Sequence, residues 1–282
     1  MKRLVLILLL FLAGASVAMG AKLSIAPNKL HQGQTMFINI SSLESECQAR
    51  VDFNNQQINC YKTGPDSFLG IVGIPCELKP GHYSLRVKIT WPDGHQQAIE
   101  KQLIIRPYPF AATSFWLKPT KKKLLKTNIV QDGWSKIEKE LIKESAQKYW
   151  QHSFVLPAKG PISMSFGTKE KVNGRQRGQH RGLDLAVISG SDVKAANNGR
   201  VVLAEALQAF GKTIVIDHGQ GVHSLYFHLS EFMSEVGDQV IKGEVIGLSG
   251  NTGVSSGPHL HWGMSVHNLR VNPMQWTKLP NL

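Results

Sequence analysis

Short apolar segments separated by glycine and proline turns run through most of this chain, and they constrain its fold more than any other feature. Early in the chain, Gln34–Ile40 and Tyr83–Ile89 place apolar residues at every second position. Later, the segments GRVVLAEA, KTIVIDHG and HSLYFHL are rich in β-branched and aromatic residues and are separated by glycines. A period of two with frequent turns predicts β-strands, so we expect a mainly β protein.

The changes in composition and strand spacing along the 282 residues predict two domains, in line with roughly 150 residues per domain. Residues 22–106 carry short strands with a turn every 8–12 residues, which is typical of a small β-sandwich. Residues 107–152 form a basic linker that is rich in proline and aromatic residues and contains a short helix. Residues 153–277 are expected to form one antiparallel β domain.

The linker helix is predicted from two features of the sequence, a capping-box motif at its start and an apolar stripe along one face. Ser135 and Glu138 have the spacing of a capping box, which places the start of the helix there. Trp134, Ile137 and Leu141 form a narrow apolar stripe among charged residues. We therefore expect this helix to pack onto a neighbouring domain.

The first twenty residues have the order of a secretory signal peptide. Lys2 and Arg3 precede the apolar run Leu4–Ala13, and small residues follow up to Gly20. The run is short for a membrane span, which needs about 20 apolar residues, although an uncleaved N-terminal anchor is the alternative. With residues 1–20 removed, no stable transmembrane segment is expected, and the protein would be exported to the periplasm or cell envelope.

The charge predicts an anionic partner. There are 32 Lys and Arg against 20 Asp and Glu, a formal net charge of +12, and only two of the basic residues belong to residues 1–20. For an exported protein, this partner is expected to be a cell-envelope polymer and not nucleic acid. Five lysines between Lys118 and Lys126 could touch such a polymer or form an ordinary solvated surface. The sequence does not indicate an oligomeric state.

The three cysteines, Cys47, Cys60 and Cys76, all lie in the first third of the chain. In an oxidising compartment two of them could pair, and Cys47 with Cys60 is the favoured pair. No Cys-x-x-Cys motif is present, which argues against a zinc site made of cysteines.

The chemistry-bearing residues gather in the last part of the chain. His259 and His261 are two apart on an expected strand and therefore share a face. His180 and Asp184 can converge because Gly182 lets the chain bend between them. Imidazole nitrogen and carboxylate oxygen are both good zinc ligands. Each of these pairs alone is a weak signal for a metal site.

Three motifs together resemble the lysostaphin-type, or LytM-type, zinc metallopeptidases of bacterial cell walls. They are HRGLDLA from His180, YFHL, and GNTGVSSGPHLHW over Gly250–Trp262, and the resemblance extends over Phe154–Pro273. The N-terminal segment, with its PGHYSLRV ending, resembles the β-sandwich that precedes this domain in some Gram-negative exported members.

The resemblance implies a zinc (Zn2+) site and a substrate class. His180, Asp184 and His261 match the three zinc ligands, and His228 and His259 match two catalytic histidines that flank the metal. Three protein ligands leave a fourth position open, as in catalytic zinc sites. One flanking histidine would act as general base and the other would stabilise the oxyanion. We favour His259 as the base, because it neighbours His261, but the sequence leaves the order open.

Three further residues receive individual predictions. Tyr226 lies two residues before His228, which would place both on one strand face and Tyr226 against substrate. Asn173, in the polar loop KVNGRQRGQ, is the other candidate for substrate binding. His218, at a strand end before glycine, is expected to be a structural hydrogen-bonding residue.

The resemblance favours a zinc endopeptidase that cleaves peptidoglycan, with D,D-endopeptidase action on stem-peptide cross-links preferred over glycyl-glycine cleavage. The alternative is a non-enzymatic LytM-type regulator that binds and activates a cell-wall amidase. Such regulators lose metal ligands, whereas all five site residues are present here, so we favour the enzyme. A basic wall-anchoring module would leave those residues without a role. Whether the N-terminal domain blocks the groove is left open.

Overall fold

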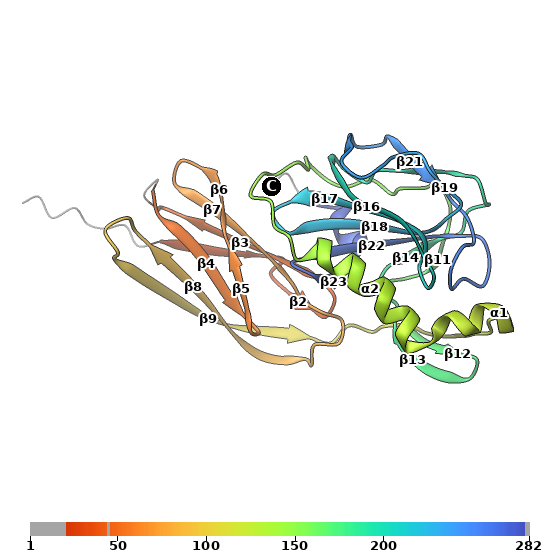
Figure 1. Ribbon diagram of the computed structural model, residues 1–282. Coiled ribbons are helices and arrows are strands. Elements are labelled where there is room, and N and C mark those ends of the chain that lie inside the picture. The colour runs from red at the N-terminus through yellow and green to blue at the C-terminus, as the bar shows by residue number, and fades with distance from the viewer. Residues whose placement is uncertain (1–20, 44–45, 280–282) are drawn as a thin grey trace, which may run out of the picture.

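The computed structural model describes residues 21–43 and 46–279, so the expected signal peptide lies outside the described residues. Two β lobes lie side by side, with helix α2 and the linker running along the second lobe (Figure 1). The prediction of a mainly β protein with an N-terminal sandwich is confirmed. In the described part of the chain, no helix is long and apolar enough to cross a membrane.

The first lobe is a sandwich of two sheets. One sheet has the order β1 (Lys22–Ala26), β3 (Thr35–Ser41), β7 (Ser67–Gly73) and β6 (Tyr61–Gly64). The other has the order β2 (Leu30–His31), β9 (Gln96–Arg106), β8 (Gly81–Thr90), β4 (Gln48–Phe53) and β5 (Gln56–Asn59). Met36, Ile38 and Ile40 of β3 are fully buried between the sheets, as their alternation predicts.

The expected disulfide is not formed. Cys47, Cys60 and Cys76 are all buried, and no disulfide links them. Burial raises the pKa of the Cys60 thiol to about 12. The prediction that Cys47 pairs with Cys60 is therefore wrong for this structure. The hydrophobic core around these residues holds the sandwich together without a cross-link.

The linker is ordered and lies against the second lobe. Strand β10 (Ala112–Phe115) pairs in parallel with β12 (Lys169–Val172), and then α1 (Pro119–Lys122), η1 (Lys123–Leu125) and α2 (Thr127–Leu141) follow. Helix α2 begins eight residues before the predicted start. Ser135 lies inside it, where its hydroxyl donates to the Asp132 carbonyl, 2.8 Å away, instead of capping the helix.

The predicted apolar stripe of α2 does pack onto a neighbouring lobe. Ile137 and Leu141 are fully buried against the second lobe, in one cluster with Leu225 and Phe227 of β18. No side-chain hydrogen bond is formed at the N-cap of the helix, so this tertiary contact contributes most of its stabilisation at that end.

The second lobe is built on a large sheet of eight strands. Its order is β11 (Ile162–Met164), β14 (Leu183–Leu185), β22 (Leu260–Val266), β18 (Val222–Leu229), β17 (Gly211–Gly219), β16 (Gly199–Leu207) and β20 (Gln239–Val240), with β23 (Leu269–Val271) also pairing with β22. A smaller sheet contains β15 (Asp192–Lys194), β21 (Val245–Leu248) and β19 (Glu231–Phe232). Every pairing within these two sheets is antiparallel. The hairpin of β12 and β13 (Arg175–Gln179) and helix α3 (Pro273–Trp276) complete the lobe.

The two lobes share a continuous apolar contact. The indole of Trp276, on α3, packs edge-on against Phe37 of β3 with ring centroids 5.7 Å apart, and its Nε1 donates to Thr35 Oγ1. The Gln275 side chain forms two hydrogen bonds of 2.7 Å with the Thr35 backbone. Nearer the second lobe's pocket, Arg181 forms an ion pair with Glu77 of the sandwich at 3.0 Å.

Candidate metal centre and active-site pocket

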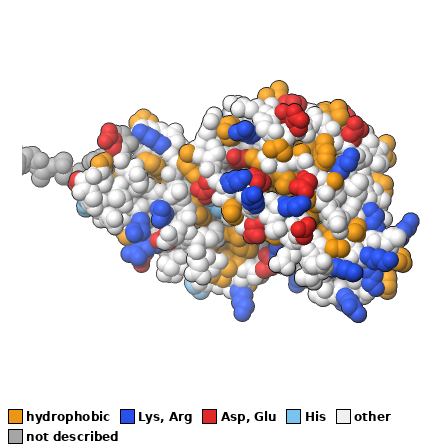
Figure 2. Space-filling view, in the orientation of Figure 1, with side chains coloured by type: hydrophobic (Ala, Val, Ile, Leu, Met, Phe, Trp, Pro, Cys, Tyr) orange, Lys and Arg blue, Asp and Glu red, His pale blue; other side chains and the backbone are white. Residues whose placement is uncertain are grey.

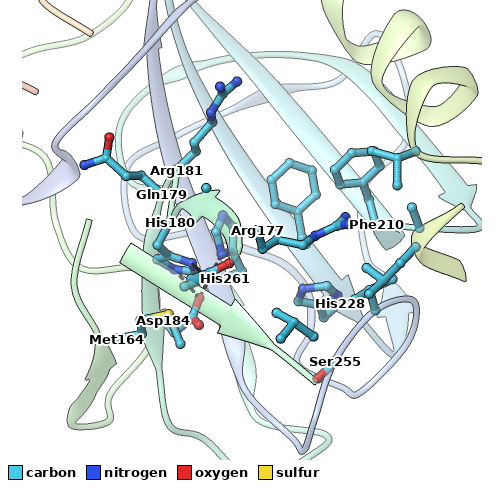
Figure 3. Close-up of a pocket in the computed structure, with 18 of the residues that line it drawn as sticks. Met164, Arg177, Gln179, His180, Arg181, Asp184, Phe210, His228, Ser255 and His261 are labelled. Atoms are coloured by element: carbon cyan, nitrogen blue, oxygen red, sulfur yellow. Dashed lines mark hydrogen bonds and ion pairs between the residues drawn. The ribbon is translucent and has the colours of Figure 1, made fainter. Parts of the chain in front are cut away.

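Two neighbouring strands and a preceding turn bring the three expected ligands together. In the β14–β22 pairing, Asp184 lies directly opposite His261, and His180 precedes β14. Asp184 Oδ1 is 2.8 Å from His261 Nδ1 and 3.0 Å from His180 Nε2 (Figure 3). One donor atom from each residue lies within 4.8 Å of the others. The sequence motifs thus converge on one point.

The electrostatics of the three ligands are strongly coupled. Burial alone would raise the pKa of Asp184, but hydrogen bonds from His180 and His261 hold it well below its usual range. Burial opposes a charge on His180, yet its bonds to Asp184 and Glu170 raise its pKa to about 9. Burial lowers the pKa of His261 to about 4. A buried carboxylate between two imidazoles is a site that favours a cation.

The donor set fits zinc. Two imidazole nitrogens and one carboxylate oxygen are a recognised zinc ligand set. Tetrahedral zinc with ligand bonds of about 2.0–2.2 Å separates neighbouring donors by roughly 3.3 Å. Two of the three separations, 2.8 and 3.0 Å from Asp184 Oδ1, lie close to that value, and all three donor atoms lie within 4.8 Å of one another.

Gly182 is the residue that permits this packing. A Cβ atom at this position would lie 2.3 Å from Nε2 of His261 and 2.8 Å from the Trp262 carbonyl oxygen. Any side chain would therefore displace the His261 ring. Glycine is required at this position because the His261 ring approaches the backbone closely, and not because the backbone adopts a left-handed conformation.

Glu170 is a candidate functional residue that sequence reasoning missed. Its Oε1 lies 2.7 Å from His180 Nδ1, so that nitrogen carries the proton and Nε2 faces the other two ligands. The Asn173-Gly174 pair was the available signal. It predicts a tight hairpin turn, which folds β12 back beside β13 and brings residue 170 close to residue 180.

His228 and His259 stand together beside the ligands, with ring centroids 4.9 Å apart. His228 Nδ1 donates to the Thr252 carbonyl at 2.8 Å, and His259 Nδ1 donates to the Gly257 carbonyl at 2.9 Å. A carbonyl oxygen only accepts, so both Nδ1 atoms carry protons and both Nε2 atoms are free to accept one. Burial, and then His259, lowers the pKa of His228 to about 3, which keeps it neutral at neutral pH.

The expected position of Tyr226 is wrong. Its side chain is fully buried in the core, where the hydroxyl accepts hydrogen bonds from the Ala196 amide and from Ser224. The cause is a bulge: His228 has φ +63°, and the β17–β18 register shifts between the pairs Lys212–Leu229 and Ile214–Tyr226. The bulge turns His228 towards the pocket and leaves Tyr226 on the opposite face.

Asn173 does not reach the groove either. It sits in the turn between β12 and β13, where its Oδ1 accepts from the Leu117 amide at 2.7 Å. Its backbone amide also donates to the Phe115 carbonyl at 3.0 Å. Asn173 therefore fastens the linker to the hairpin, and it does not line the pocket. His218, in contrast, is the structural residue expected, since its ring nitrogens bond to the Asn198 carbonyl and Ser224 Oγ.

The metal centre opens into a pocket of about 800 Å³. The floor carries the five site residues together with Phe210 and Phe227, and the hairpin supplies Arg177. The linker and α2 supply another wall, made of Leu117, Leu125, Thr127, Val130, Gln131 and Trp134. Lys121 anchors this wall, because its Nζ donates to the carbonyls of Asn251 and Gly253 at 2.7 Å each. The linker is thus part of the pocket.

Comparison with known proteins supports the resemblance. Residues 178–273 match the model of Peptidase family M23. A solved structure described as a putative peptidase M23 from Pseudomonas aeruginosa superposes with a TM-score of 0.66 at 25% identity, covering 89% of this chain and 95% of that one.

Two curated relatives each match slightly less than half of this chain. Murein hydrolase activator EnvC of Escherichia coli is 34% identical over 130 residues, which is 46% of this chain and 29% of EnvC. Peptidoglycan DD-endopeptidase ShyA of Vibrio cholerae is 35% identical over 133 residues, 47% of this chain and 31% of ShyA. The alignments thus span less than a third of either relative. The relatives of this chain therefore include one named an endopeptidase and one named an activator.

Proposed function

We propose that this chain, which carries a peptidase family M23 domain over residues 178–273, is a zinc-dependent endopeptidase that cleaves peptide bonds of peptidoglycan. The observation that carries the proposal is the set of five side chains in one pocket. Three of them offer donors to one metal ion, and two more are anchored to backbone carbonyls through Nδ1, which leaves their Nε2 atoms directed away from those anchors. A structural metal site would have no need for two such histidines.

His180, Asp184 and His261 would hold the metal ion. When bound, zinc would lower the pKa of a water ligand and polarise the scissile carbonyl. The protein's own residues supply the proton transfers. His259 Nε2 accepts the proton of the attacking water and returns it to the leaving amine. We place the base at His259 because its Nε2 lies 3.8 Å from Asp184 Oδ2, beside the ligands.

His228 has a complementary role. Its buried ring is fixed by the bond to the Thr252 carbonyl and stands 4.9 Å from the His259 ring. As negative charge develops on the carbonyl oxygen of the substrate, His228 Nε2 would take up a proton from solvent, and the resulting N–H would donate a hydrogen bond to the oxyanion. Both histidines are backbone-anchored, so little reorganisation accompanies the reaction.

The rival function is regulation, and EnvC, which is named as an activator, is the relative that favours it. A regulator that only binds an amidase needs the fold but has no use for a complete ligand set. Here the ligands and both flanking histidines are present, and Glu170 orients one ligand. We therefore rank the enzyme first. Among peptide bonds, we favour the D,D-cross-link, because the relative ShyA is named a DD-endopeptidase.

We further propose that the protein works in the cell envelope, with peptidoglycan as its partner. The basic excess of the chain and the N-terminal pattern of residues 1–20 support export to that compartment. The substrate class also requires it, because peptidoglycan lies outside the cytoplasmic membrane.

Mass spectrometry of muropeptides tests the proposal. The purified protein should convert cross-linked peptidoglycan fragments of defined structure to monomers, and chelation followed by zinc should abolish and restore this conversion. His259→Ala serves as a control against a contaminating enzyme. The regulatory alternative predicts no conversion by the protein alone and faster release of stem peptides when an amidase is added.

A further inference from the structure

The pocket contains a buried arginine that the proposed chemistry does not use. Arg270, on β23, lines the pocket but is only 7% exposed. Its Nη2 donates to the Arg181 carbonyl at 2.6 Å, and its buried Nε has no hydrogen-bond partner. Within residues 21–43 and 46–279, no carboxylate forms an ion pair with this guanidinium. Arg270 is therefore a buried cation without an anion.

The surroundings of Arg270 hold its side chain in place. The guanidinium carbon lies 5.8 Å from the ring centroids of both Phe227 and Trp134. On β22, a Cβ atom at Gly263 would lie 1.7 Å from Arg270 Nη2. Gly263 thus leaves the space that the guanidinium fills, and the position of the charge is fixed before any ligand arrives.

The location relates this charge to the metal centre. Gly263 follows the ligand His261 by two residues on the same strand face, a separation of about 7 Å. The ring of Phe227, which lies under Arg270, is also 5.2 Å from the His261 ring. A peptide advances roughly 3.5 Å per residue when extended, so Arg270 reaches a group one to two residues from a bond held at the metal.

An uncompensated charge in this position calls for an explanation. Burial of a guanidinium without a partner is costly, and such a charge is normally paired. Burial, followed by the nearby Arg181, lowers the pKa of Arg270 to about 9, so it still carries its charge at neutral pH. Arg177 adds a second, exposed cation, and its side chain extends across the pocket in the view of Figure 3. Arg181 contributes less, because it is paired with Glu77.

We propose that Arg270, assisted by Arg177, is a specificity-determining subsite that binds a free carboxylate of the peptide substrate, one or two residues from the scissile bond. The planar guanidinium can bind a carboxylate through two parallel hydrogen bonds, and its buried Nε has no hydrogen-bond partner in the described chain. The inference rests on the proposed function and narrows it to cross-linked stem peptides that carry such a carboxylate. Two groups of the substrate have this chemistry: the C-terminal carboxylate of a stem peptide, and the α-carboxylate of a branched diamino acid at the cross-link.

Matched substrates distinguish these sources. Three synthetic cross-linked peptides are compared: one with both carboxylates free, one with the C-terminal carboxylate amidated, and one with the diamino-acid carboxylate amidated. One amidation should lower kcat/KM at least tenfold, and the other should have little effect, which identifies the carboxylate that Arg270 binds. Equal kcat/KM for all three peptides would overturn the inference while leaving the endopeptidase intact.

A binding measurement makes the inference independent of turnover. Calorimetric titration of the His259→Ala protein with the three peptides should show the same preference, at least tenfold in Kd, for the free carboxylate. If the unaltered protein cleaves no peptide, the proposed function fails. The titration still shows whether the protein prefers the free carboxylate, and so whether the subsite exists. Equal Kd values for the three peptides exclude it.

Variants locate the preference. Arg270→Gln should remove the discrimination between carboxylate and carboxamide, and Arg270→Lys should restore part of it while losing the planar fork. Zinc content and circular dichroism check that these variants fold. If they do not fold, Arg177→Gln, at an exposed position, is tested instead, and it should weaken the discrimination between carboxylate and carboxamide. Arg200→Gln, an exposed arginine outside the pocket, is the matched control and should discriminate like the unaltered protein. Unchanged discrimination in both Arg270 variants would assign the carboxylate site elsewhere.

Discussion

Glu170 Oε1 lies 2.7 Å from Nδ1 of His180, so a carboxylate on one strand of the β12–β13 hairpin orients a proposed metal ligand that follows the other strand. This bond fixes which ring nitrogen of His180 faces Asp184 and His261. It also couples the hairpin to the metal centre, since β12 is paired on its other side with linker strand β10. The linker, the hairpin and the ligand therefore form one connected unit.

Replacement of Glu170 tests this connection. Glu170→Gln should weaken zinc binding by about 10- to 100-fold, because the partner of a ligating histidine sets its orientation and basicity. Competition titration with a chromogenic chelator measures this affinity. Glu205→Gln, an exposed carboxylate on β16 that pairs with Lys136, is the control and should bind zinc normally. Equal affinities for the two variants would mean that Glu170 has no role at the metal.

The ligand set was predictable from sequence because its parts are local. His259 and His261 share a strand face, and His180 and Asp184 flank a glycine, so short-range geometry brings each pair together. Glu170 was not found, although the Asn173-Gly174 pair predicts the hairpin that brings it close to His180. Arg270 was not found because it joins the pocket only through the pairing of β23 with β22, which the local pattern does not reveal. The linker wall was missed for the same reason, as its contacts with residues 209–256 are long-range.

The two wrong site residues have separate physical causes. Tyr226 was placed by counting two residues back along a regular strand, but the bulge at His228 breaks that count. Asn173 was placed in an open loop, whereas the loop is a hairpin turn that binds the linker backbone. For Tyr226 a backbone irregularity outweighed a correct strand prediction, whereas for Asn173 the predicted loop is a hairpin of strands β12 and β13.

The ligand assignment predicts a separable loss of metal. His261→Ala should remove most of the bound zinc, measured by elemental analysis of the dialysed protein, because two ligands alone bind zinc weakly. The lobe should remain folded, since its core is formed by residues such as Ile216 and Trp262 that do not contact metal. Full zinc occupancy in this variant would contradict the assignment.

The two histidines proposed as catalytic, His228 and His259, should behave in the opposite way. His228→Ala and His259→Ala should each retain zinc but lose activity by about 10²- to 10⁴-fold, since proton transfer and oxyanion stabilisation each contribute on that scale. Steady-state hydrolysis of a cross-linked peptide and metal analysis are measured on the same preparations. Loss of zinc comparable to that in His261→Ala would show that a ligand has been mistaken for a catalytic group.

The buried His218 predicts a dependence of stability on pH. Burial lowers its pKa to about 4 from the usual 6.5, so the folded protein keeps it neutral while the unfolded chain takes up a proton below pH 6.5. Its contribution is therefore complete above pH 6.5 and is lost as the pH falls towards 4, on the order of 3 kcal/mol in total. Denaturation of His218→Gln, measured between pH 7.5 and 4.5, should show lower stability at pH 7.5 but a shallower slope. Parallel slopes for the two proteins would remove His218 as the cause.

The lysine-rich linker predicts salt-dependent binding to the cell wall. Lysine and arginine side chains gather at the end of the molecule that carries α1 (Figure 2). Lys118, Lys122, Lys123 and Lys126 are exposed there, whereas Lys121 is half-buried and holds residues 251 and 253. The four exposed lysines are free to meet anionic polymer, and such attraction is screened beyond about 8 Å at physiological salt.

Replacement of these four lysines by glutamine, with Lys121 kept, should therefore reduce co-sedimentation with purified wall and flatten its decline with salt. Hydrolysis of a small soluble peptide should be unchanged, because the pocket wall stays anchored. Lys121→Gln is the contrasting variant: it removes one charge and should leave wall binding nearly intact, but it should alter KM by releasing the loop at Asn251 and Gly253. Wall binding that is insensitive to both salt and the fourfold replacement would assign targeting to the N-terminal sandwich instead.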